Sequence, residues 1–215
     1  MEHPTPSPSK REARKQDRRM AILCTARRAF LEQGYSATSM SGIAAQLGGS
    51  KATLWSYFPN KEELFAAVLD EATREYRQQL TDLLKPSDDV RATLVEFARG
   101  FLTKLTSPDA LRLHRLVAAE VGRAPEVGEI FYRRAPQRTR ELLTGFLAEA
   151  MKAGQLREED PADAARVMTA LCLGGLHQRM LWGQDEGGPD KVAAEAERAA
   201  EVFLRAFGVL NPQVA

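Results

Sequence analysis

Apolar residues recur at helical spacing along almost the whole chain, and no segment alternates strictly between apolar and polar side chains. Ile22, Ala26 and Phe30 lie at positions i, i+4 and i+8, which places them on one face of a helix. A half-buried strand would need a period of two residues instead. The pattern therefore predicts an all-α protein of about nine helices.

Glycine, proline and capping residues mark where the expected helices begin and end. Ser39, Ser50 and Ser87 stand where N-caps are expected, and Asp160 followed by Pro161 is typical of a cap with proline in the first turn. The expected helices cover residues 17–33, 40–47, 51–58, 61–84, 87–105, 108–121, 125–153 with a break near Pro136, 161–182 and 190–207.

The composition is that of a globular protein. The chain has 215 residues, of which 44% are hydrophobic and 27% charged. The N-terminus lacks the apolar segment of a signal peptide, and no run approaches the roughly 18 apolar residues of a membrane helix. Cys24 and Cys172 both lie among apolar residues, as buried reduced thiols do. We therefore expect a cytoplasmic protein without membrane contact.

Positive charge is concentrated at the N-terminal end. The net charge is +1 overall, yet residues 1–61 hold ten Lys and Arg against four acidic residues, so this part is +6 and the remainder is −5. The asymmetry predicts a polyanionic partner for the basic part alone. We expect residues 1–16 to form a disordered basic arm. The charged run at 10–19 is either a solvated segment or an arm that contacts phosphates or the minor groove.

The segment Ser50–Phe58 combines polar and aromatic side chains on very few helical turns. Two short helices joined by the turn "GGS" and braced by a longer first helix form a helix-turn-helix unit, whose second helix enters the major groove of DNA. Leu54 and Phe58 would hold this helix to its own domain. The side chains expected to meet bases, phosphates or sugars are Lys51, Ala52, Thr53, Trp55, Ser56 and Tyr57, with Lys61 gripping a phosphate from the next helix.

The same region resembles the DNA-binding head of the tetracycline-repressor (TetR) family. Residues 21–69 carry the motifs "A-x3-F-x3-GY" from Ala26, "TSM-x2-IA" from Thr38 and "SKATLW-x-YF-x-NKEELF" from Ser50. The resemblance implies a transcriptional regulator that binds a double-stranded DNA operator. It places the contacts on Met40, Ser41, Lys51, Ala52, Thr53, Trp55, Ser56, Tyr57 and Lys61.

Two residues depart from the family pattern. Gly49 stands where an apolar residue is usual, and Trp55 stands where tyrosine is usual. Gly49 removes a core contact. Gly42 lies inside a short helix, where glycine destabilises the helix by up to ~1 kcal/mol relative to alanine. We therefore expect a head that is less stable than is usual for the family.

The resemblance extends to the remainder of the chain. "LRLHRLVAAEVGRAPEVGEIFYRRAP" and "LCLGGLHQRMLWG" resemble the AefR-like branch of the family. This implies a helix-turn-helix domain at 17–64 and a helical effector-binding and dimerisation domain at 65–215. It also implies a ligand-responsive repressor without a cofactor, which binds a palindromic operator as a homodimer and is released by its effector.

The C-terminal domain holds candidates for an effector cavity, although aromatic residues and methionines at helical spacing more often belong to plain core. The candidates are Phe97, Phe101, His114, Val117, Phe131, Tyr132, Met168 and Cys172. We expect a small apolar effector. A basic patch at Arg133, Arg134, Arg138 and Arg140 is either solvated and paired with carboxylates or attracts an anionic effector.

Two apolar helices near the C-terminus are candidates for a dimer interface. Gly174 and Gly175 would let another helix approach closely, and an apolar stripe runs along the last helix. The alternative is that both helices pack inside a single chain. The residues expected at the interface are Gly174, Gly175, Leu176, Ala196, Ala199 and Phe203.

Two other classes of protein are considered. An enzyme is disfavoured because the chain has no phosphate-binding loop, no nucleophile elbow and no histidine set for a metal, so no catalytic or metal site is expected. An architectural DNA binder without an effector remains open. A ligand that raises the thermal stability of the protein would favour a sensor.

Overall fold

The computed structural model of the chain describes residues 10–48 and 51–209. Within these residues every regular element is helical, and the only β-type contact is an isolated bridge between Leu156 and Gly208. The all-α prediction is confirmed. Residues 1–9 of the expected arm, the departure at Gly49 and the expected cap Ser50 lie outside the described residues.

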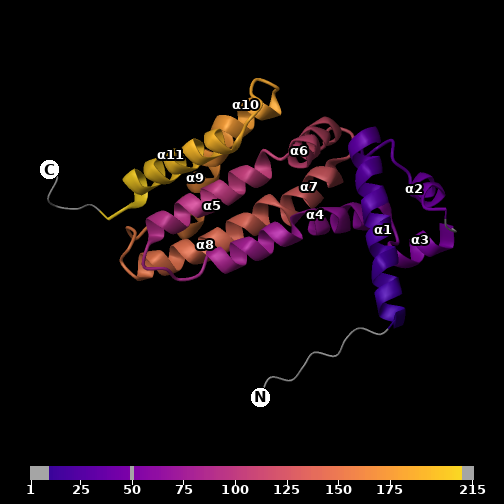
Figure 1. Ribbon diagram of the computed structural model, residues 1–215, viewed down its shortest axis with the longest axis horizontal. Coiled ribbons are helices and arrows are strands. Elements are labelled where there is room, and N and C mark those ends of the chain that lie inside the picture. Colours follow the sequence, from indigo (N-terminus) through magenta and orange to yellow (C-terminus); the bar gives the residue numbers. More distant parts are fainter. Residues whose placement is uncertain (1–9, 49–50, 210–215) are drawn as a thin grey trace, which may run out of the picture.

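Three helices at one end of the molecule form the head: α1 (Lys10–Gln33), α2 (Met40–Gln46) and α3 (Lys51–Tyr57). The long helix α4 (Lys61–Leu83) runs from the head into the body. Figure 1 shows the head at one end, with α1 lying across the long axis of the molecule and α4 lying along it.

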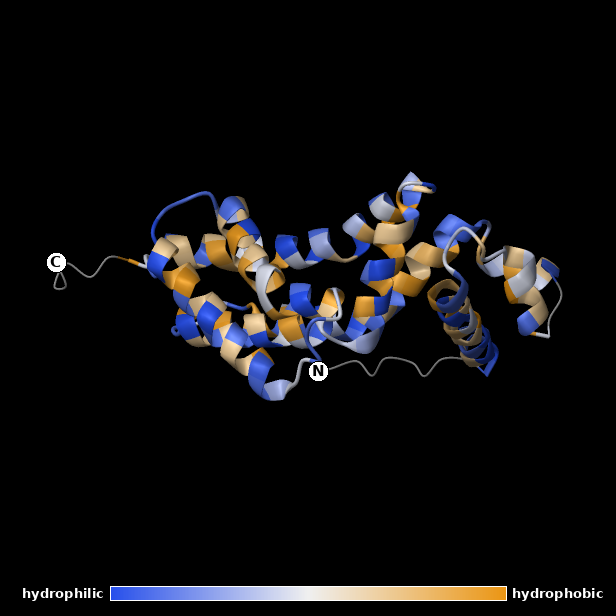
Figure 2. Ribbon diagram, turned by 90° about the horizontal axis from the view of Figure 1, so that it is seen from above, coloured by the Kyte–Doolittle hydropathy of each residue, from blue (hydrophilic) through white to orange (hydrophobic). Residues whose placement is uncertain are grey.

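The body contains the remaining elements. They are α5 (Val90–Leu105), α6 (Pro108–Glu120), α7 (Pro125–Arg134), α8 (Pro136–Lys152), α9 (Pro161–Cys172), the π-helix η1 (Leu173–His177), α10 (Gln178–Leu181) and α11 (Pro189–Phe207). α11 packs along α5 and α9, and α8 packs on α9. Hydrophobic and hydrophilic residues alternate along these helices in Figure 2, and the buried hydrophobic ones form the core of the body.

The core consists of two hydrophobic clusters that meet along α4. The head cluster contains Phe30, Tyr35 and Phe65, whose rings pack edge to face or stacked with centroids 5.2–5.7 Å apart. It continues along α4 to Leu69 and includes Leu116 of α6, Val127 and Ile130 of α7, and Ala124 just before α7. The body cluster begins at Tyr76 on the same helix. The head is therefore packed against the body and is not tethered to it by a flexible linker.

Capping explains several of the helix boundaries. The Ser39 hydroxyl accepts a hydrogen bond from the backbone N–H of Gly42 at 3.0 Å, and Asp160 caps α9 ahead of Pro161, both as predicted. Gly34 follows α1 with φ of +85°, a backbone conformation that suits glycine. The predicted break at Pro136 separates α7 from α8.

Three expected boundaries are wrong. α1 begins at Lys10 rather than near Asp17, because the charged run is built from good helix formers without glycine or proline. α5 is capped by the Asp89 carboxylate and not by Ser87, whose hydroxyl accepts from the Asp89 N–H instead. The helix expected at 161–182 is interrupted by η1, where Gly175 leaves helical backbone angles.

Candidate nucleic-acid interface and effector cavity

The short helix α3 presents one polar face to solvent. Leu54 and Phe58 are 2% and 4% exposed and anchor the helix to the head core, as predicted. Lys51, Ala52 and Ser56 are exposed on the opposite side. This is the arrangement that a recognition helix requires, since the anchored face fixes its orientation and the free face meets the groove.

The aromatic and hydroxyl residues of α3 differ in exposure. Trp55 is 39% exposed, whereas Tyr57 and Thr53 are half-buried. Tyr57 packs partly against the head cluster, so its ring also supports the fold. The Ser56 hydroxyl donates to the backbone carbonyl of Thr53 at 2.7 Å and keeps its lone pairs for another donor.

Helix α2 supports α3 and carries the remaining predicted contacts of the head. Met40 and Ser41 occupy its first turn and are half-buried. The buried Thr38 hydroxyl just before this helix donates to the carbonyls of Gly34 at 2.7 Å and Ala29 at 3.2 Å. These bonds fix the turn between α1 and α2, and with it the position of the first turn of α2.

The sequence led us to expect that the Lys61 ammonium binds a DNA phosphate. In the structure this ammonium is hydrogen-bonded within the protein. Its Nζ donates to the backbone carbonyls of Tyr35 at 3.0 Å and Thr38 at 3.2 Å, and lies 4.2 Å from the centroid of the Tyr35 ring. The N-terminus of α4 is also capped, because the Asn60 side chain accepts from the Glu63 N–H at 2.7 Å. Lys61 therefore stabilises the turn between α1 and α2.

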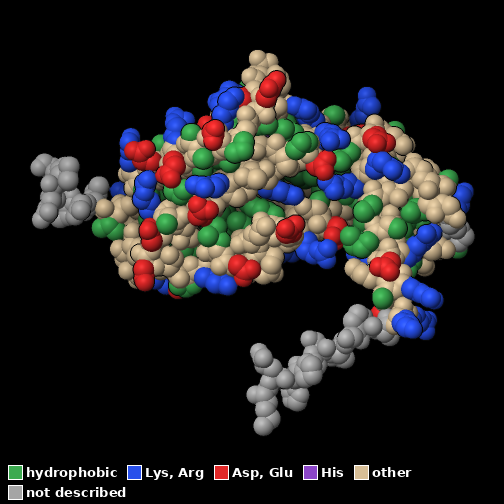
Figure 3. Space-filling view, viewed as in Figure 1, with side chains coloured by type: hydrophobic (Ala, Val, Ile, Leu, Met, Phe, Trp, Pro, Cys, Tyr) green, Lys and Arg blue, Asp and Glu red, His purple; other side chains and the backbone are tan. Residues whose placement is uncertain are grey.

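The N-terminal half of α1 adds positive charge to the head. Arg11, Arg14 and Lys15 are exposed, and the Arg19 guanidinium lies 5.4 Å from the centroid of the Phe58 ring. Figure 3 shows Lys and Arg side chains gathered at this end of the molecule, while both signs of charge are mixed over the body. These basic residues of α1 thus belong to the same head as α3.

Two polar contacts join the head to α6 of the body. Arg27 on α1 forms an ion pair with Asp109 at the start of α6. At the other end of α6, the Glu120 carboxylate accepts from the hydroxyl of Ser36 and from its backbone N–H at 3.3 Å. The hydrogen bond from the Ser36 hydroxyl lowers the pKa of Glu120. No local sequence pattern indicates these contacts, because the partners are more than 80 residues apart.

A partly enclosed cavity of about 110 Å³ lies in the body between α4, α5, α6, α7 and the start of α8. Three of the predicted residues, Phe101, His114 and Phe131, line it together. Tyr76 and Leu113 also line it and were missed, because helical spacing alone does not distinguish cavity wall from core. The ring of His114 packs edge-on against Phe131 with centroids 5.3 Å apart.

The other predicted lining residues lie elsewhere. Phe97, Met168 and Cys172 are fully buried in the body core. Val117 packs against the head cluster. Tyr132 is 47% exposed, with the Arg140 guanidinium 5.0 Å from its ring centroid. Their apolar character therefore reflects packing and not the cavity.

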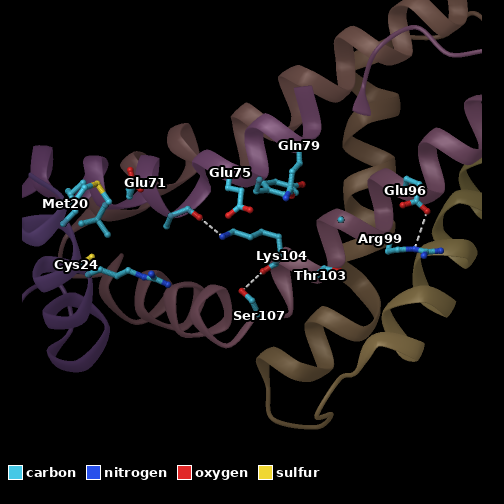
Figure 4. Close-up of a pocket in the computed structure, with 16 residues that line it drawn as sticks. Met20, Cys24, Glu71, Glu75, Gln79, Glu96, Arg99, Thr103, Lys104 and Ser107 are labelled. Atoms are coloured by element: carbon cyan, nitrogen blue, oxygen red, sulfur yellow. Dashed lines mark hydrogen bonds and ion pairs between the residues drawn. The ribbon is translucent and has the colours of Figure 1, made fainter. Parts of the chain in front are cut away.

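A wide cleft of about 690 Å³ separates α1 from α5 alongside α4 (Figure 4). Lys104 and Tyr76 line both this cleft and the cavity. The Lys104 Nζ donates to the backbone carbonyl of Ala72 at 2.6 Å, and burial lowers the pKa of Lys104. Cys24 also lines the cleft and is exposed, contrary to the expectation that both cysteines are buried.

The basic patch of the body is largely paired with acidic side chains. Arg134 contacts Asp70 at 2.8 Å, and the two other pairs are Arg133 with Glu129 at 3.2 Å and Arg138 with Glu141 at 3.3 Å. Arg140 donates to the Tyr132 hydroxyl. This result favours the paired interpretation over an anion site.

Four residues expected at a dimer interface are instead buried within the chain. Leu176, Ala196, Ala199 and Phe203 are at most 4% exposed, because α11 packs its apolar stripe against α5 and α9, and η1, which carries Leu176, packs against α5 and α11. Gly175 lies against Glu195 of α11, so the close approach expected there occurs inside the chain. Gly174 is exposed. Large exposed apolar side chains nearby are Leu173, Trp182 and Val202.

The part of the chain that the structure describes contains neither a metal-binding group of side chains nor a membrane-spanning helix. No group of three or more histidine, cysteine or acidic side chains is placed to hold a metal ion. No helix among residues 10–48 and 51–209 has the length and apolar character needed to cross a membrane.

Comparison with known proteins gives matches over most of the chain. Residues 22–68 match the bacterial regulatory proteins of the tetR family, and residues 92–209 match the C-terminal domain of AefR-like transcriptional repressors. A helix-turn-helix transcriptional repressor of Mycobacterium tuberculosis is 28% identical over 180 residues, which are 82% of this chain and 88% of that protein.

Solved structures of similar fold are also regulators. A TetR-family transcriptional regulator from Mesorhizobium loti has a TM-score of 0.79 and 27% identity, covering 94% of this chain and 100% of that chain. The flavonoid-responsive regulator FrrA has a TM-score of 0.78 and 34% identity, covering 92% and 100%. The head geometry, the helical body and these matches together place the chain in the TetR family of DNA-binding transcriptional regulators, with a C-terminal domain of the AefR-like type.

Proposed function

We propose that this regulator is a cytoplasmic repressor that binds a palindromic operator as a homodimer and releases it when a small apolar effector enters the body. The proposal rests on the orientation of α3, which buries one face in the head and exposes the other to solvent. Leu54 and Phe58 anchor it, while Lys51, Ala52, Trp55 and Ser56 form an exposed surface on a head that also carries the basic residues of α1.

Dimerisation is supported by apolar side chains that the chain leaves exposed near its C-terminus. Leu173, Trp182 and Val202 are 39%, 65% and 37% exposed, on or next to η1, α10 and α11. Covering them with a second copy would remove this apolar surface from water. A symmetric pair would also carry two recognition helices, as a palindromic site requires.

Effector response is supported by the position of the cavity between the elements that hold the head. α4 lines the cavity and continues into the head core. α6 lines it with His114 and contacts the head through Asp109 and Glu120. A ligand that shifts either helix moves the recognition helix, with typical coupling of about 1–3 kcal/mol. FrrA, at 34% identity, is named as flavonoid-responsive, which supports ligand response here.

A gel-shift titration on the promoter region of its own gene tests the proposal. We expect a site-selective complex with two chains, or a multiple of two, per DNA fragment. Its affinity should fall steeply with salt because Lys and Arg replace counterions on the phosphates. Lys51→Ala should lower the affinity by on the order of 1–3 kcal/mol while leaving the dimer intact. A complex that forms equally on unrelated DNA would contradict the proposal.

A further inference from the structure

The wall of the cavity next to α6 carries positive charge without a carboxylate. Arg77, Lys104 and Arg134 are among its lining residues, and no Asp or Glu of the described residues lines it. The body as a whole is different, because residues 62–215 carry a net charge of −5. A hollow lined by charges of one sign attracts ligands of the opposite sign. The wall of this cavity therefore favours an anion.

Two of these cations also border an open cleft, which we call the arginine cleft. Its volume is about 610 Å³, and its lining residues are Asp70, Arg77, Thr81, Arg134, Arg138, Glu141 and Leu142. Arg77 and Arg134 are the two residues that line both hollows. The mostly apolar cavity and the polar cleft therefore adjoin at these two arginines.

Arg77 and Arg134 share a single acidic partner. The Asp70 carboxylate accepts from Nη1 of Arg77 at 3.1 Å and from Nη1 of Arg134 at 2.8 Å. Nη2 of Arg77 also donates to the Asp70 backbone carbonyl at 3.1 Å. Each guanidinium has five N–H donors, so both keep donors for another acceptor. Two positive charges thus face one negative charge, and a second carboxylate would balance them.

The other arginines of the basic patch do not share a partner in this way. Arg133, Arg138 and Arg140 each have a partner of their own. The paired interpretation therefore holds for these three residues. The excess positive charge is located at Arg77 and Arg134, where the cavity adjoins the arginine cleft.

The rest of the cavity wall is largely apolar. Phe101, Leu113 and Phe131 contribute to it, and its volume is about 110 Å³. A cavity of roughly 150 Å³ in another protein holds benzene, so one small ring or a short chain fits here. The Lys104 ammonium donates to the neutral Ala72 carbonyl at 2.6 Å, so this bond leaves its positive charge uncompensated. The site thus combines a small apolar space with an excess of positive charge at its edge.

Building on the proposed effector role, we propose that the effector is an amphipathic organic acid, with a small apolar ring or chain and one carboxylate. The apolar part lies in the cavity against Phe101 and Phe131. The carboxylate lies at the edge of the arginine cleft and accepts from the guanidiniums of Arg77 and Arg134, next to Asp70. Arginine suits this role because its planar N–H groups match the geometry of a carboxylate.

Calorimetric titration of the full-length protein with 3-phenylpropionate and with 3-phenylpropanamide tests the proposal. The two probes have nearly the same shape, and only the acid is charged. At low salt we expect the acid to bind about tenfold or more tightly than the amide, and the difference should shrink as salt screens the arginines. Equal affinities, a preference for the amide, or no binding of either probe at millimolar concentration would overturn the proposal.

Substitutions of the two arginines assign the contacts. Arg77→Gln and Arg134→Gln should each weaken the acid about three- to tenfold and leave the affinity of the amide unchanged, which also shows that the cavity is intact. Arg134→Lys keeps the charge and should retain part of the preference for the acid. Arg133→Gln is the matched control, because Arg133 is the neighbouring residue on α7 and lines neither hollow. A preference for the acid that survives both glutamine substitutions at Arg77 and Arg134 would also overturn the proposal.

Gel shifts on operator DNA with and without 3-phenylpropionate separate this inference from the proposed function. If the acid binds with the expected preference but the protein shows no operator complex, the ligand class stands and the repressor role fails. If the operator complex forms and a neutral apolar compound releases it, while the acid shows no preference over its amide, the repressor role stands and the ligand class is wrong.

Discussion

Two lysines of the head illustrate how burial decides the role of a side chain. Lys51 is exposed on α3, where its ammonium is free to meet DNA. Lys61 is half-buried, and its ammonium holds two carbonyls of the α1–α2 turn. The sequence predicted both as DNA contacts, because a cation next to a helix start indicates a phosphate grip. The carbonyl partners of Lys61 lie 23 and 26 residues away and come close only in the folded head.

Substituting each lysine by methionine separates the two roles. Lys61→Met should lower the free energy of unfolding by about 1–3 kcal/mol, because it removes two charge-assisted hydrogen bonds and a cation–ring contact. Lys51→Met should change that free energy by less than about 0.5 kcal/mol and weaken operator binding instead. Urea unfolding and gel shifts on the same preparations measure both effects. A Lys61 variant as stable as the parent would refute the structural role.

The lowered pKa of His114 predicts that the protein loses stability in mild acid. Burial, followed by the neighbouring His177, lowers its pKa from the usual 6.5 to about 4 in the folded protein. Between these values the unfolded chain binds a proton that the folded chain does not. The associated stability is therefore complete above pH 6.5 and is lost as the pH falls towards 4, by on the order of 2–3 kcal/mol.

Urea unfolding at several pH values between 7.5 and 4.5 measures this effect. His114→Gln cannot titrate at this position, so its stability should depend less on pH across the same range. Identical pH profiles for the variant and the parent would show that His114 is not buried in its neutral form.

At the scale of elements, helix α11 and η1 fit together at a glycine. A Cβ on Gly175 would overlap the carboxylate of Glu195, whereas a Cβ on Gly174 would meet open space. Glu195 is only 14% exposed and has Arg198 at 3.7 Å and Arg179 at 3.9 Å. The two adjacent glycines therefore serve different purposes, and only Gly175 is needed for close packing.

Alanine substitution at each glycine tests this difference. Gly175→Ala should lower the free energy of unfolding by about 1–3 kcal/mol, because Glu195 must move away from its arginines. Gly174→Ala should be neutral or stabilising by up to about 1 kcal/mol. Thermal unfolding of both variants provides the measurement. Equal effects at the two positions would show that the Glu195 contact does not restrict η1.

Most helices could be predicted from the sequence, but the partners of their faces could not. Ser39, Asp160 and Pro136 marked boundaries correctly because capping and proline effects are local. The stripe along α11 correctly indicated a buried face, yet its partner is α5 of the same chain and not a second copy. Helical periodicity indicates that one face of a helix is buried, but it does not identify the element that packs against that face. The same limit explains why Phe97 was predicted for the cavity and lies in the core.

At the scale of the whole molecule, the head is attached to the body along two helices. α4 passes through both hydrophobic clusters, and α6 contacts the head at both of its ends. Figure 1 shows that the head lies at the far end of the elongated body from α11. Under the proposed effector response, we expect a small tilt of the body helices at the cavity to displace α3 together with the rest of the head.

The basic start of α1 should contribute to affinity without contributing to sequence preference. Removing residues 1–16 deletes Lys10, Arg11, Arg14 and Lys15, all exposed in the structure. Binding should weaken on every DNA sequence, and the slope of log affinity against log salt should become shallower by about 0.9 for each phosphate that the shortened chain no longer neutralises. Replacing the four cations by glutamine is the matched control that keeps the helix. A changed consensus sequence would mean that this segment reads bases in the minor groove.

The role of α3 as the helix that reads DNA is tested by selecting DNA fragments with the purified full-length protein and sequencing them. We expect a two-fold symmetric consensus whose half-sites are spaced for two recognition helices on the same dimer. Lys51→Ala should lose enrichment of that consensus while still folding. Recovery of no consensus from the parent protein, or of the same consensus at full strength from Lys51→Ala, would contradict the assignment of α3.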